Sequence, residues 1–495
     1  MPETPPPISG TRERRIVWLA CGLATLHVFL FSAAFPFFNN TDEDSHFDLV
    51  VKYAHNDIPL DHSPEESLRF LATYHSYAYL STVDDFPDRQ FPKPLWKQPA
   101  ELQPKLLAAK EAVRGSVANL ESAQPPLYYT IAGLSWNVCR HLGLSDGNRI
   151  YALRFLNAFF VVALVILGYT TARIVFPAQV FPRLAVPLLI AFFPQTIFYS
   201  INNDLLTAVT FSLTFLLLTK WMRTDPPDAR LGAALGIAVA VSFLAKMSTV
   251  PLIAATFAAV LAKAALPAKG KKISASLPAL AALFISAAVP MAAWMATCRV
   301  RFGDLTGTAF KMNRLHWTYQ PFGEWWHHPL FTPHGFWYFL SGNIASLWQG
   351  EFWWNGKPMT LPLSNLIYVI LTLIFVGTAM VAIIRDRKSQ SFPPLALSFA
   401  CVTVAFLFYG FLSVIYDFDG CAYPSREHPY FVSGRLLLGA LVPFLLLFTW
   451  GIQRAFHRSD RAKWIALVTL LGFMLLSEIA TDFPAFTNEY NWFHM

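Results

Sequence analysis

Charged residues are scarce in this sequence. Asp, Glu, Lys and Arg make up 14% of the 495 residues, whereas hydrophobic residues make up 55%. A soluble domain carries about 25% charged residues, because its surface must be covered with groups that water solvates. The shortage therefore excludes a water-exposed surface over a single core, and it favours helices that are solvated by lipid.

Cysteine is also scarce, with five residues in the chain. None of them has the Cys-x-x-Cys or Cys/His spacing that is typical of zinc sites, which argues against a zinc module. Cys298 and Cys421 fall in two loops that we predict to lie on the same side of a membrane. The sequence therefore allows a disulfide between these two residues without requiring one.

A single basic face or tail is lacking as well, although the formal net charge is +7. The basic residues stand in short clusters between apolar runs, which is the pattern of cytoplasmic loops under the positive-inside rule. We therefore expect no nucleic-acid partner. The clusters are Arg12, Arg14 and Arg15; Lys269, Lys271 and Lys272; Arg385, Arg387 and Lys388; and Arg454, Arg458, Arg461 and Lys463.

Long apolar runs dominate the rest of the sequence. A membrane-spanning helix needs about 20 mostly apolar residues. The first such run is long for a signal peptide and no small-residue cleavage site follows it, so we interpret it as a retained signal anchor. The predicted spans are 16–38, 150–174, 183–201, 204–221, 231–247, 250–267, 274–297, 362–384, 393–416, 432–451 and 464–480.

One short apolar run, 126–139, decides the topology. If it spanned the membrane, the basic clusters after it would face outward, against the positive-inside rule. We therefore place it in the membrane interface, where Tyr128, Tyr129 and Trp136 are typical residues. The prediction is an all-α integral membrane protein of about eleven spans, with its N-terminus inside and its C-terminus outside.

This topology predicts one transmembrane domain, residues 1–480, followed by an outer tail, 481–495. The domain includes a first outer loop, 39–148, with amphipathic juxtamembrane helices, and an aromatic-rich second outer loop, 298–361. Neither loop shows a sustained strand pattern, and no internal repeat indicates an inverted-repeat transporter. We expect the aromatic residues of the second loop mainly to rest on the bilayer.

Ionisable residues from four segments reach the outer membrane boundary in this topology. Asp42 and Glu43 follow the first span, and Asp204 begins a later one. Lys246 and Arg435 stand at the outer ends of two more spans, where the positive-inside rule gives a cation little reason to be. Arg and Lys bind phosphate, and a carboxylate can take a proton from a hydroxyl or an amine. The set therefore suits transfer of the head of a phosphate-bearing lipid.

Each residue also has a purely structural interpretation. The acids after the first span could begin a solvated helix with Thr41 as its N-cap, and Asp204 could cap a helical hairpin. Lys246 could extend its charge to the interface while its stem stays in lipid. A functional role is favoured because all these groups lie at the same outer membrane boundary in the predicted topology.

Five motifs in sequence order resemble the GT-C glycosyltransferases, which include protein O-mannosyltransferases and the aminoarabinose transferases of lipid A. The last of the five resembles a largely uncharacterised bacterial branch. The motifs are Asp42-Glu43-x-x-His46-Phe47, Gln124-Pro125-Pro126-Leu127-Tyr128-Tyr129, Arg154-Phe155-Leu156-Asn157, the stretch from Phe193-Pro194 to Asn203-Asp204, and Gly434-Arg435-Leu436-Leu437.

The resemblance implies a membrane glycosyltransferase with a polyprenyl-phosphate-linked sugar donor and single-displacement inversion. The acceptor would be a glycan, lipid or protein, and the site would face the periplasm from a bacterial inner membrane. Asp42 would be the base, with Glu43 next, and Asp204 would assist the acceptor. Lys246 and Arg435 would stabilise the departing phosphate. The other candidate substrate-binding residues are His46, Gln124, Tyr128 and Asn203.

A cofactor is not required by this mechanism. Asn202, Asn203 and Asp204 stand where oligosaccharyltransferases carry Asp-x-Glu, and a divalent cation such as Mg²⁺ or Mn²⁺ stays open. The alternatives are a lipid or glycan transporter or flippase, and a glycan ligase of another fold. A transporter predicts charged residues in mid-membrane, and the apolar runs are nearly free of charge there.

Overall fold

The computed structural model describes residues 10–56, 62–265, 276–387, 389, 391–421 and 423–492. Its α-helices are α1 (Gly10–Ala34), α2 (Glu43–Ala54), α3 (Glu65–Tyr74), α4 (Gln103–Gly115), α5 (Leu127–His141), α6 (Asp146–Val175), α7 (Val180–Ala191), α8 (Asp204–Arg223), α9 (Ala229–Ala245), α10 (Val250–Ala265), α11 (Leu277–Phe302), α12 (Thr308–Leu315), α13 (Pro333–Gln349), α14 (Pro362–Arg385), α15 (Phe392–Ile415), α16 (Leu441–Ala455) and α17 (Asp460–Phe486). Short 3₁₀ turns are η1 (Val83–Asp85), η2 (Leu95–Lys97), η3 (Thr196–Tyr199), η4 (Met247–Thr249), η6 (Phe322–His327), η7 (Pro329–Phe331) and η8 (Gly434–Ala440).

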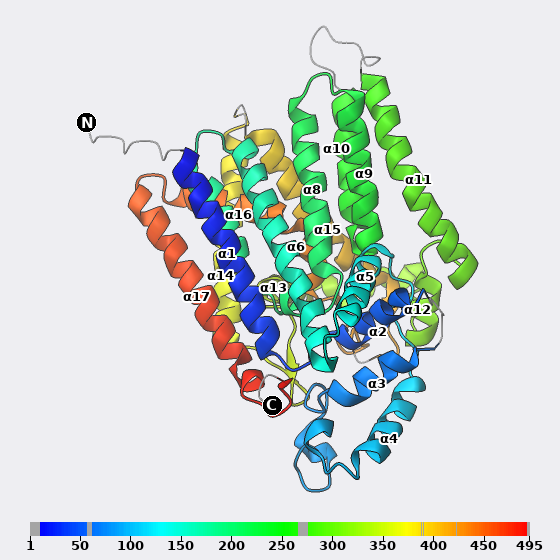
Figure 1. Cartoon of the computed structure of the whole chain (residues 1–495). Coiled ribbons are helices and arrows are strands. Elements are labelled where there is room, and N and C mark those ends of the chain that lie inside the picture. Colours follow the sequence, from blue (N-terminus) through cyan, green and yellow to red (C-terminus); the bar gives the residue numbers. More distant parts are fainter. Residues whose placement is uncertain are drawn as a thin grey trace.

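The long apolar helices stand side by side in one bundle (Figure 1). Nine helical stretches in the described part of the chain are long and apolar enough to cross a membrane. They are α1, α6, α8, α10 with the preceding η4, α11, α14, α15, α16 with the preceding η8, and α17. The shorter apolar helices α7 and α9 occupy the other two predicted spans. The all-α membrane architecture is therefore confirmed, whereas the number eleven and the orientation stay predictions.

The predicted span 183–201 is wrong as a continuous helix. Helix α7 ends at Ala191, and an irregular segment follows as far as Asp204. The cause lies in Pro194, because the residue before a proline is disfavoured in helical geometry. Backbone groups of this segment that have no helical partner are bonded by side chains. For example, the Asn40 side chain donates to Thr196 O at 2.8 Å. Such a break is tolerated where protein surrounds it.

The bundle has two different ends. One end, which we call the loop end, carries α2 to α5 and lies at the bottom of Figure 1. Helix α1 begins at the other end, which we call the basic end (Figure 1). The basic end carries Arg12, Arg14, Arg15, Arg385, Arg387, Arg454, Arg458, Arg461 and Lys463, whereas Lys269, Lys271, Lys272 and Lys388 lie outside the described residues.

The first predicted outer loop packs on the loop end of the bundle through its own core. Helices α2 and α5 lie against each other, and Phe47 meets Trp136 edge to face at 5.3 Å. Gly133 allows this approach, because a Cβ there would stand 3.0 Å from the backbone nitrogen of Ala54. Helix α5 is not among the described helices that are long and apolar enough to span a membrane, and the interface position of 126–139 stays a prediction.

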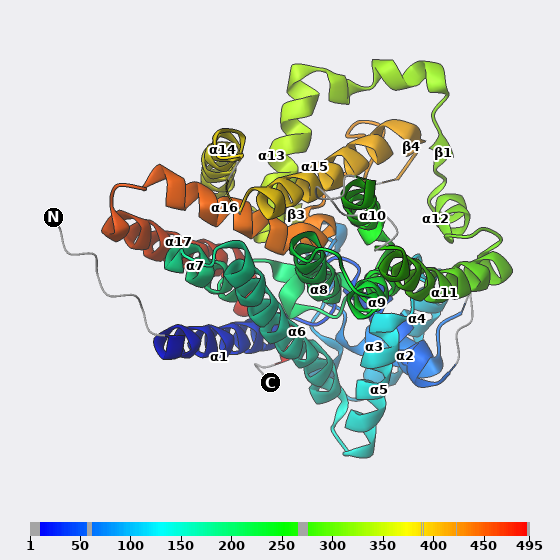
Figure 2. The same ribbon diagram turned by 90° about the horizontal axis from the view of Figure 1, so that it is seen from above.

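The second predicted outer loop runs as an arch around α15 (Figure 2). One short antiparallel strand pair fastens it to the segment after α15, and another forms a hairpin within it. Strand β1 (Thr318–Tyr319) pairs with β4 (Tyr416–Asp417), and β2 (Trp353–Trp354) pairs with β3 (Lys357–Pro358). Phe322 and Trp326 on the arch are exposed. Their resting on a bilayer remains an expectation.

The end of the chain folds back on the first loop. Helix α17 continues to Phe486, past the predicted span end at 480. Beyond it, the ring of Trp492 lies 5.1 Å from that of Tyr74 and 5.4 Å from that of Trp96. The predicted tail is therefore a docked segment at the loop end rather than a separate unit.

A polar cluster lies inside the bundle, against the sequence indication of an almost charge-free interior. The Nε2 atom of His27 on α1 lies 2.8 Å from Glu478 Oε2 on α17, and its Nδ1 lies 3.1 Å from Ala191 O. The Tyr199 hydroxyl also donates to Glu478. This cluster joins α1, α7, η3 and α17, and it fixes the irregular segment before Asp204.

The five cysteines are free. Cys298 is buried near the end of α11, and Cys421 lies in the loop after β4. The structure therefore contains no Cys298–Cys421 bridge between these two described residues.

Candidate active site

Four ionisable residues from separate segments meet at the loop end of the bundle. Asp42 directly precedes α2, and Asp204 is the first residue of α8. Lys246 follows the last residue of α9, and Arg435 lies in the first turn of η8. The convergence that the sequence predicted is therefore present in the structure.

The guanidinium of Arg435 is the centre of the group. Its Nη2 donates to Asp42 Oδ2, and its Nη1 lies 3.6 Å from Asp204 Oδ2. Its Nε lies 4.0 Å from Oε2 of a third carboxylate, Glu351. One cation thus faces three carboxylates that come from distant parts of the chain.

Lys246 supplies the second positive charge. Its Nζ donates to Asp204 Oδ1 at 2.6 Å, and both residues are buried. Asp204 therefore lies between two cations. Asp204 keeps Lys246 and Arg435 in place, and the two cations in turn neutralise its charge from both sides.

Asp42 has an unusual backbone conformation, and its side chain does not cap its own helix. Its φ of 59° and ψ of 9° lie in the left-handed region, which Asp tolerates better than most residues. Asp42, and not Thr41, occupies the N-cap position of α2, and its side chain makes no capping hydrogen bond. The carboxylate turns to Arg435 and remains 37% exposed. Strained backbone of this kind is common at functional sites.

Glu43 lies in a different environment from its neighbour. It is fully buried, and its two oxygens accept from Arg154 Nε at 2.8 Å and Nη2 at 2.7 Å. Its Oε1 also accepts from the backbone nitrogen of Ile201 at 3.0 Å. The remaining Arg154 donors bond the backbone oxygens of Ser32, Phe35 and Pro36. This pair joins α1, α2 and α6 and fixes the turn that carries Asp42.

His46 lies one turn along α2 and faces the charged group. Its Nδ1 lies 2.7 Å from the Tyr129 hydroxyl, and its buried Nε2 has no hydrogen-bond partner among the described residues. Burial lowers the pKa of His46 to about 4, against the opposing effect of nearby Glu121. The ring is therefore neutral at pH 7 and can either accept or donate one hydrogen bond.

The other predicted binding residues border this group. Gln124 accepts from the Asn203 side chain at 3.3 Å and donates to Glu121 Oε2 at 2.5 Å. Asn203 also donates to Ala245 O, directly before Lys246. Tyr128 is fully buried beside Tyr129, with ring centroids 5.4 Å apart. Tyr128 thus supports the site from within the first-loop core.

Sequence reasoning missed three residues of the site: Glu121, Lys311 and Glu351. Lys311 on α12 donates to Glu121 Oε1 at 2.8 Å. Burial raises the pKa of Glu121, but the charge of Lys311 and its hydrogen bond outweigh this effect, so that the net pKa lies below the usual range. The available signals were a lone glutamate three residues before Gln124 and isolated charges in an aromatic loop.

Several buried polar atoms at this place lack hydrogen bonds. Within the described part of the chain, no partner is found for Asp204 Oδ2, Asn203 Oδ1, Arg435 Nε or His46 Nε2. Unsatisfied buried groups are costly and rare, so their gathering around two cations is typical of a ligand site. The arrangement can bind an anion and, at the same time, several hydroxyl groups.

A metal site does not emerge from these residues. Among the described residues there is no group of three or more His, Cys, Asp or Glu side chains that could hold a metal ion. The carboxylates of the site are instead paired with Arg435 and Lys246.

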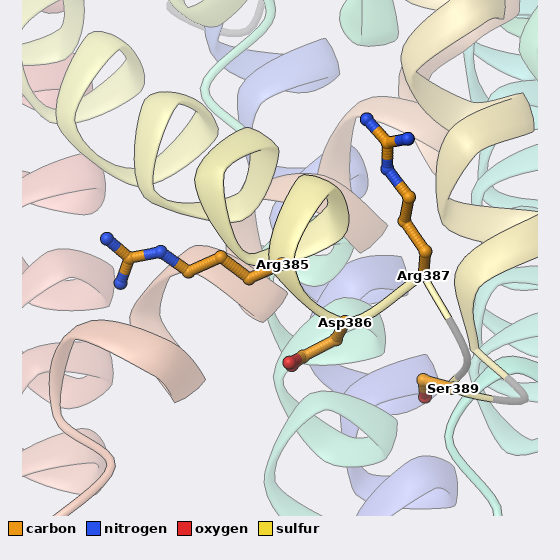
Figure 3. Close-up of a pocket in the computed structure, with 4 residues that line it drawn as sticks. All are labelled: Arg385, Asp386, Arg387 and Ser389. Carbon is orange, nitrogen blue, oxygen red and sulfur yellow. The ribbon is translucent and has the colours of Figure 1, made fainter.

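A separate cavity lies at the basic end of the bundle. It measures about 410 Å³ and is lined by Arg385, Asp386, Arg387 and Ser389 (Figure 3). Helix α14 ends here, and its 24 residues place the cavity about 36 Å from the loop end at 1.5 Å per residue. Asp386 pairs with Arg454 at 2.8 Å. This cavity is remote from the charged group around Arg435.

Solved structures with a similar chain path include two membrane enzymes. One is ArnT from Cupriavidus metallidurans bound to undecaprenyl phosphate, with a TM-score of 0.46, 11% identity, and coverage of 92% of this chain and 63% of that chain. Another is the oligosaccharyltransferase AglB from Archaeoglobus fulgidus in complex with an inhibitory peptide and a dolichol-phosphate, with a TM-score of 0.41, 12% identity, and coverage of 97% and 55%. Both are GT-C glycosyltransferases, the class that the sequence motifs resemble. The chain thus spans less than two thirds of the length of either structure.

Sequence comparison gives the family. No curated protein matches the chain. The family described as Predicted membrane protein (DUF2142) matches residues 25–416, which include the second part of α1, the helices α2 to α15 and all the site residues except Arg435. Because this match covers most of the chain, the protein belongs to the DUF2142 family of predicted membrane proteins.

Proposed function

We propose that this protein is a GT-C-type membrane glycosyltransferase. It transfers a sugar from a polyprenyl-phosphate-linked donor to a glycan, lipid or protein acceptor. The reaction takes place at the loop end of the bundle, which we assign to the outer, periplasmic face of a bacterial inner membrane.

One observation carries this proposal, namely the meeting of Arg435 and Lys246 with Asp42 and Asp204. A guanidinium and an ammonium side by side suit a phosphate group. The exposed carboxylate of Asp42 beside them suits removal of a proton. The unsatisfied atoms of Asn203, His46 and Asp204 suit the hydroxyls of a sugar.

The mechanism follows from these positions. Asp42 takes the proton from the acceptor hydroxyl or amine, whose oxygen or nitrogen attacks the anomeric carbon. The bond from that carbon to the phosphate oxygen breaks, and the polyprenyl phosphate leaves with the bonding electrons. Arg435 and Lys246 stabilise the negative charge on the leaving phosphate. When the donor binds, its phosphate replaces the Asp42 carboxylate as the partner of the Arg435 guanidinium. This exchange frees the carboxylate for the acceptor.

The other residues have supporting roles in this proposal. Asp204 holds Lys246 and Arg435 in place, and Glu43 positions Asp42 through Arg154. Asp42 is thus the base, and Glu43 is not needed as a second one. His46, Gln124 and Asn203 provide hydrogen bonds where sugar and acceptor meet, and Tyr128 supports their positions from the core of the first loop.

Transfer is tested with the purified protein and a panel of polyprenyl-phosphate sugars. We expect release of polyprenyl phosphate with at least one donor. Asp42→Asn should lower turnover by about 10²- to 10⁴-fold, which is the usual contribution of a general base. The matched control is Asp84→Asn, which changes an exposed aspartate of the same loop. Full activity of Asp42→Asn would refute the base assignment.

The assignment of the loop end to the outer face has its own test. Ser145 is exposed between α5 and α6. Ser145→Cys in a cysteine-free background should react with an impermeant maleimide added to intact cells. Labelling that appears only after the membrane is opened would reverse the orientation and would place the site in the cytoplasm.

A further inference from the structure

Glu351 is fastened to the segment that carries Asp42. It lies between α13 and β2, and its backbone oxygen accepts from the Thr41 hydroxyl at 3.0 Å. The next residue, Phe352, forms an antiparallel bridge with Asn40. These backbone links hold Glu351 at a fixed place relative to Asp42, whatever side chain stands at position 351.

The side chain of Glu351 is only loosely paired. Its Oε2 lies 4.0 Å from Arg435 Nε, which is the longest of the three carboxylate contacts of Arg435. Its Oε1 is buried and has no hydrogen-bond partner in the part of the chain that the structure describes. Glu351 therefore has one oxygen available for a ligand at the charged group.

The charge balance around Arg435 leaves Glu351 as the excess carboxylate. Asp204 is bound to Lys246 at 2.6 Å, and Asp42 is bound directly to Arg435. Two cations thus already have two carboxylate partners. A phosphate group entering between these cations would meet a third negative charge if Glu351 were ionised, and two like charges at close range repel each other more strongly in a partly buried site than in water.

The surroundings of Glu351 disfavour its ionised form. Burial raises its pKa, Arg435 and the nearby Ser433 side chain oppose this effect, and the charges of Asp42 and Asp204 add to it, so that the net pKa is raised. Among the described residues, Tyr423 is another titratable neighbour, and its pKa is also raised by burial and then by Glu351. Tyr423 therefore stays neutral where Glu351 titrates.

We propose that Glu351 binds the phosphate group of the donor as a neutral carboxylic acid, so that phosphate binding is coupled to protonation of Glu351. The acid donates its proton in a hydrogen bond to a phosphate oxygen, and no bond to that proton is broken in the binding step. This inference rests on the proposed function, because it names the third group that holds the donor phosphate beside Arg435 and Lys246.

The test measures binding of a short-chain polyprenyl methyl phosphodiester, followed by the tryptophan fluorescence of the full-length protein in detergent between pH 5 and pH 8. A phosphodiester carries one charge over this range, so its own titration does not contribute. We expect the affinity of the wild type to fall as the pH rises above the pKa of Glu351, by up to about tenfold per pH unit, since one proton is linked to binding.

Two substitutions and one control separate protonation from shape. Glu351→Gln, which donates a hydrogen bond at every pH, should bind with a flat pH profile at about the low-pH affinity of the wild type. Glu351→Ala should bind weakly at every pH. Glu324→Gln, which changes an exposed glutamate of the same loop, should keep the wild-type profile.

The outcomes distinguish this inference from the proposed function. A flat wild-type profile, or an unchanged slope in Glu351→Gln, overturns the role of Glu351 while phosphate binding stands. Absence of binding at every pH in the wild type contradicts both proposals. Inorganic phosphate is the second probe, and competition by it at similar concentration would show that the site selects a free anion and not a lipid headgroup.

Discussion

Asp42 and Glu43 are adjacent in the sequence, and each is paired with an arginine, yet the two pairs differ in every physical respect. The Glu43–Arg154 pair is buried, and the guanidinium of Arg154 is fully used by carboxylate and backbone oxygens. The Asp42–Arg435 pair is partly exposed, and Arg435 is shared among three carboxylates with its Nε unsatisfied within the described residues.

The difference separates a structural pair from a binding pair. A buried pair with all its donors and acceptors satisfied has nothing left to offer a ligand, and breaking it leaves a buried charge. A pair with surplus charge and unsatisfied atoms can exchange one partner for a ligand group. We infer that Glu43 supports the turn and that Asp42 acts from it.

The largest expected effect concerns the closed pair. Glu43→Gln leaves the buried charge of Arg154 without its partner, which costs about 3–5 kcal/mol when one member of such a pair is removed. Thermal unfolding in detergent should show a large loss of stability. The matched control is Asp42→Asn, the same change one residue earlier, which should cost less than about 1 kcal/mol because that side chain is partly exposed. Equal losses in the two variants would abolish the distinction between the pairs.

A smaller effect is expected at the open pair. Arg435→Lys keeps the charge but loses the planar fork that can hold a phosphate and a carboxylate together. We expect donor affinity to fall by about tenfold, which corresponds to about 1.4 kcal/mol, with little change in thermal stability. Arg426→Lys is the control, because it alters an exposed arginine that pairs with Asp417 and Asp419. Unchanged donor affinity in Arg435→Lys would contradict the phosphate role.

The smallest effect concerns His46, which lies on α2 one turn after Asp42. Its pKa of about 4 is below the usual value of 6.5. The unfolded chain therefore binds a proton between these values when the folded chain does not, and stability falls as the pH drops from 6.5 towards 4. His46→Gln should reduce this acid loss, measured as the difference in melting temperature between pH 6.5 and pH 4.5. His141→Gln, at an exposed position, should leave the difference as in the wild type.

Much of the fold could be predicted because its signals are local. Apolar runs of sufficient length form spanning helices wherever lipid surrounds them. The alternation of spans and basic clusters then predicted one shared end of the bundle for Asp42, Asp204, Lys246 and Arg435. The break after Ala191 was missed because the apolar run continues past it, and only Pro194 hinted at the interruption.

Which arginine pairs with which carboxylate of the site could not be predicted in the same way. Glu43 and Arg154 are 111 residues apart, and Asp42 and Arg435 are 393 residues apart. A motif that contains both acids gives no indication of which arginine each will meet. Glu121, Lys311 and Glu351 were missed for the same reason, since their partners come from distant segments.

The sequence by itself determined that this protein is a polytopic helical membrane protein with ionisable residues gathered at one end, because hydrophobic length and charge alternation act along the chain. Only the tertiary structure decided which carboxylate is closed off by Arg154 and which ones share Arg435. The physical reason is that burial and pairing depend on side chains from distant segments meeting in space, and the pattern of a single segment does not contain that information.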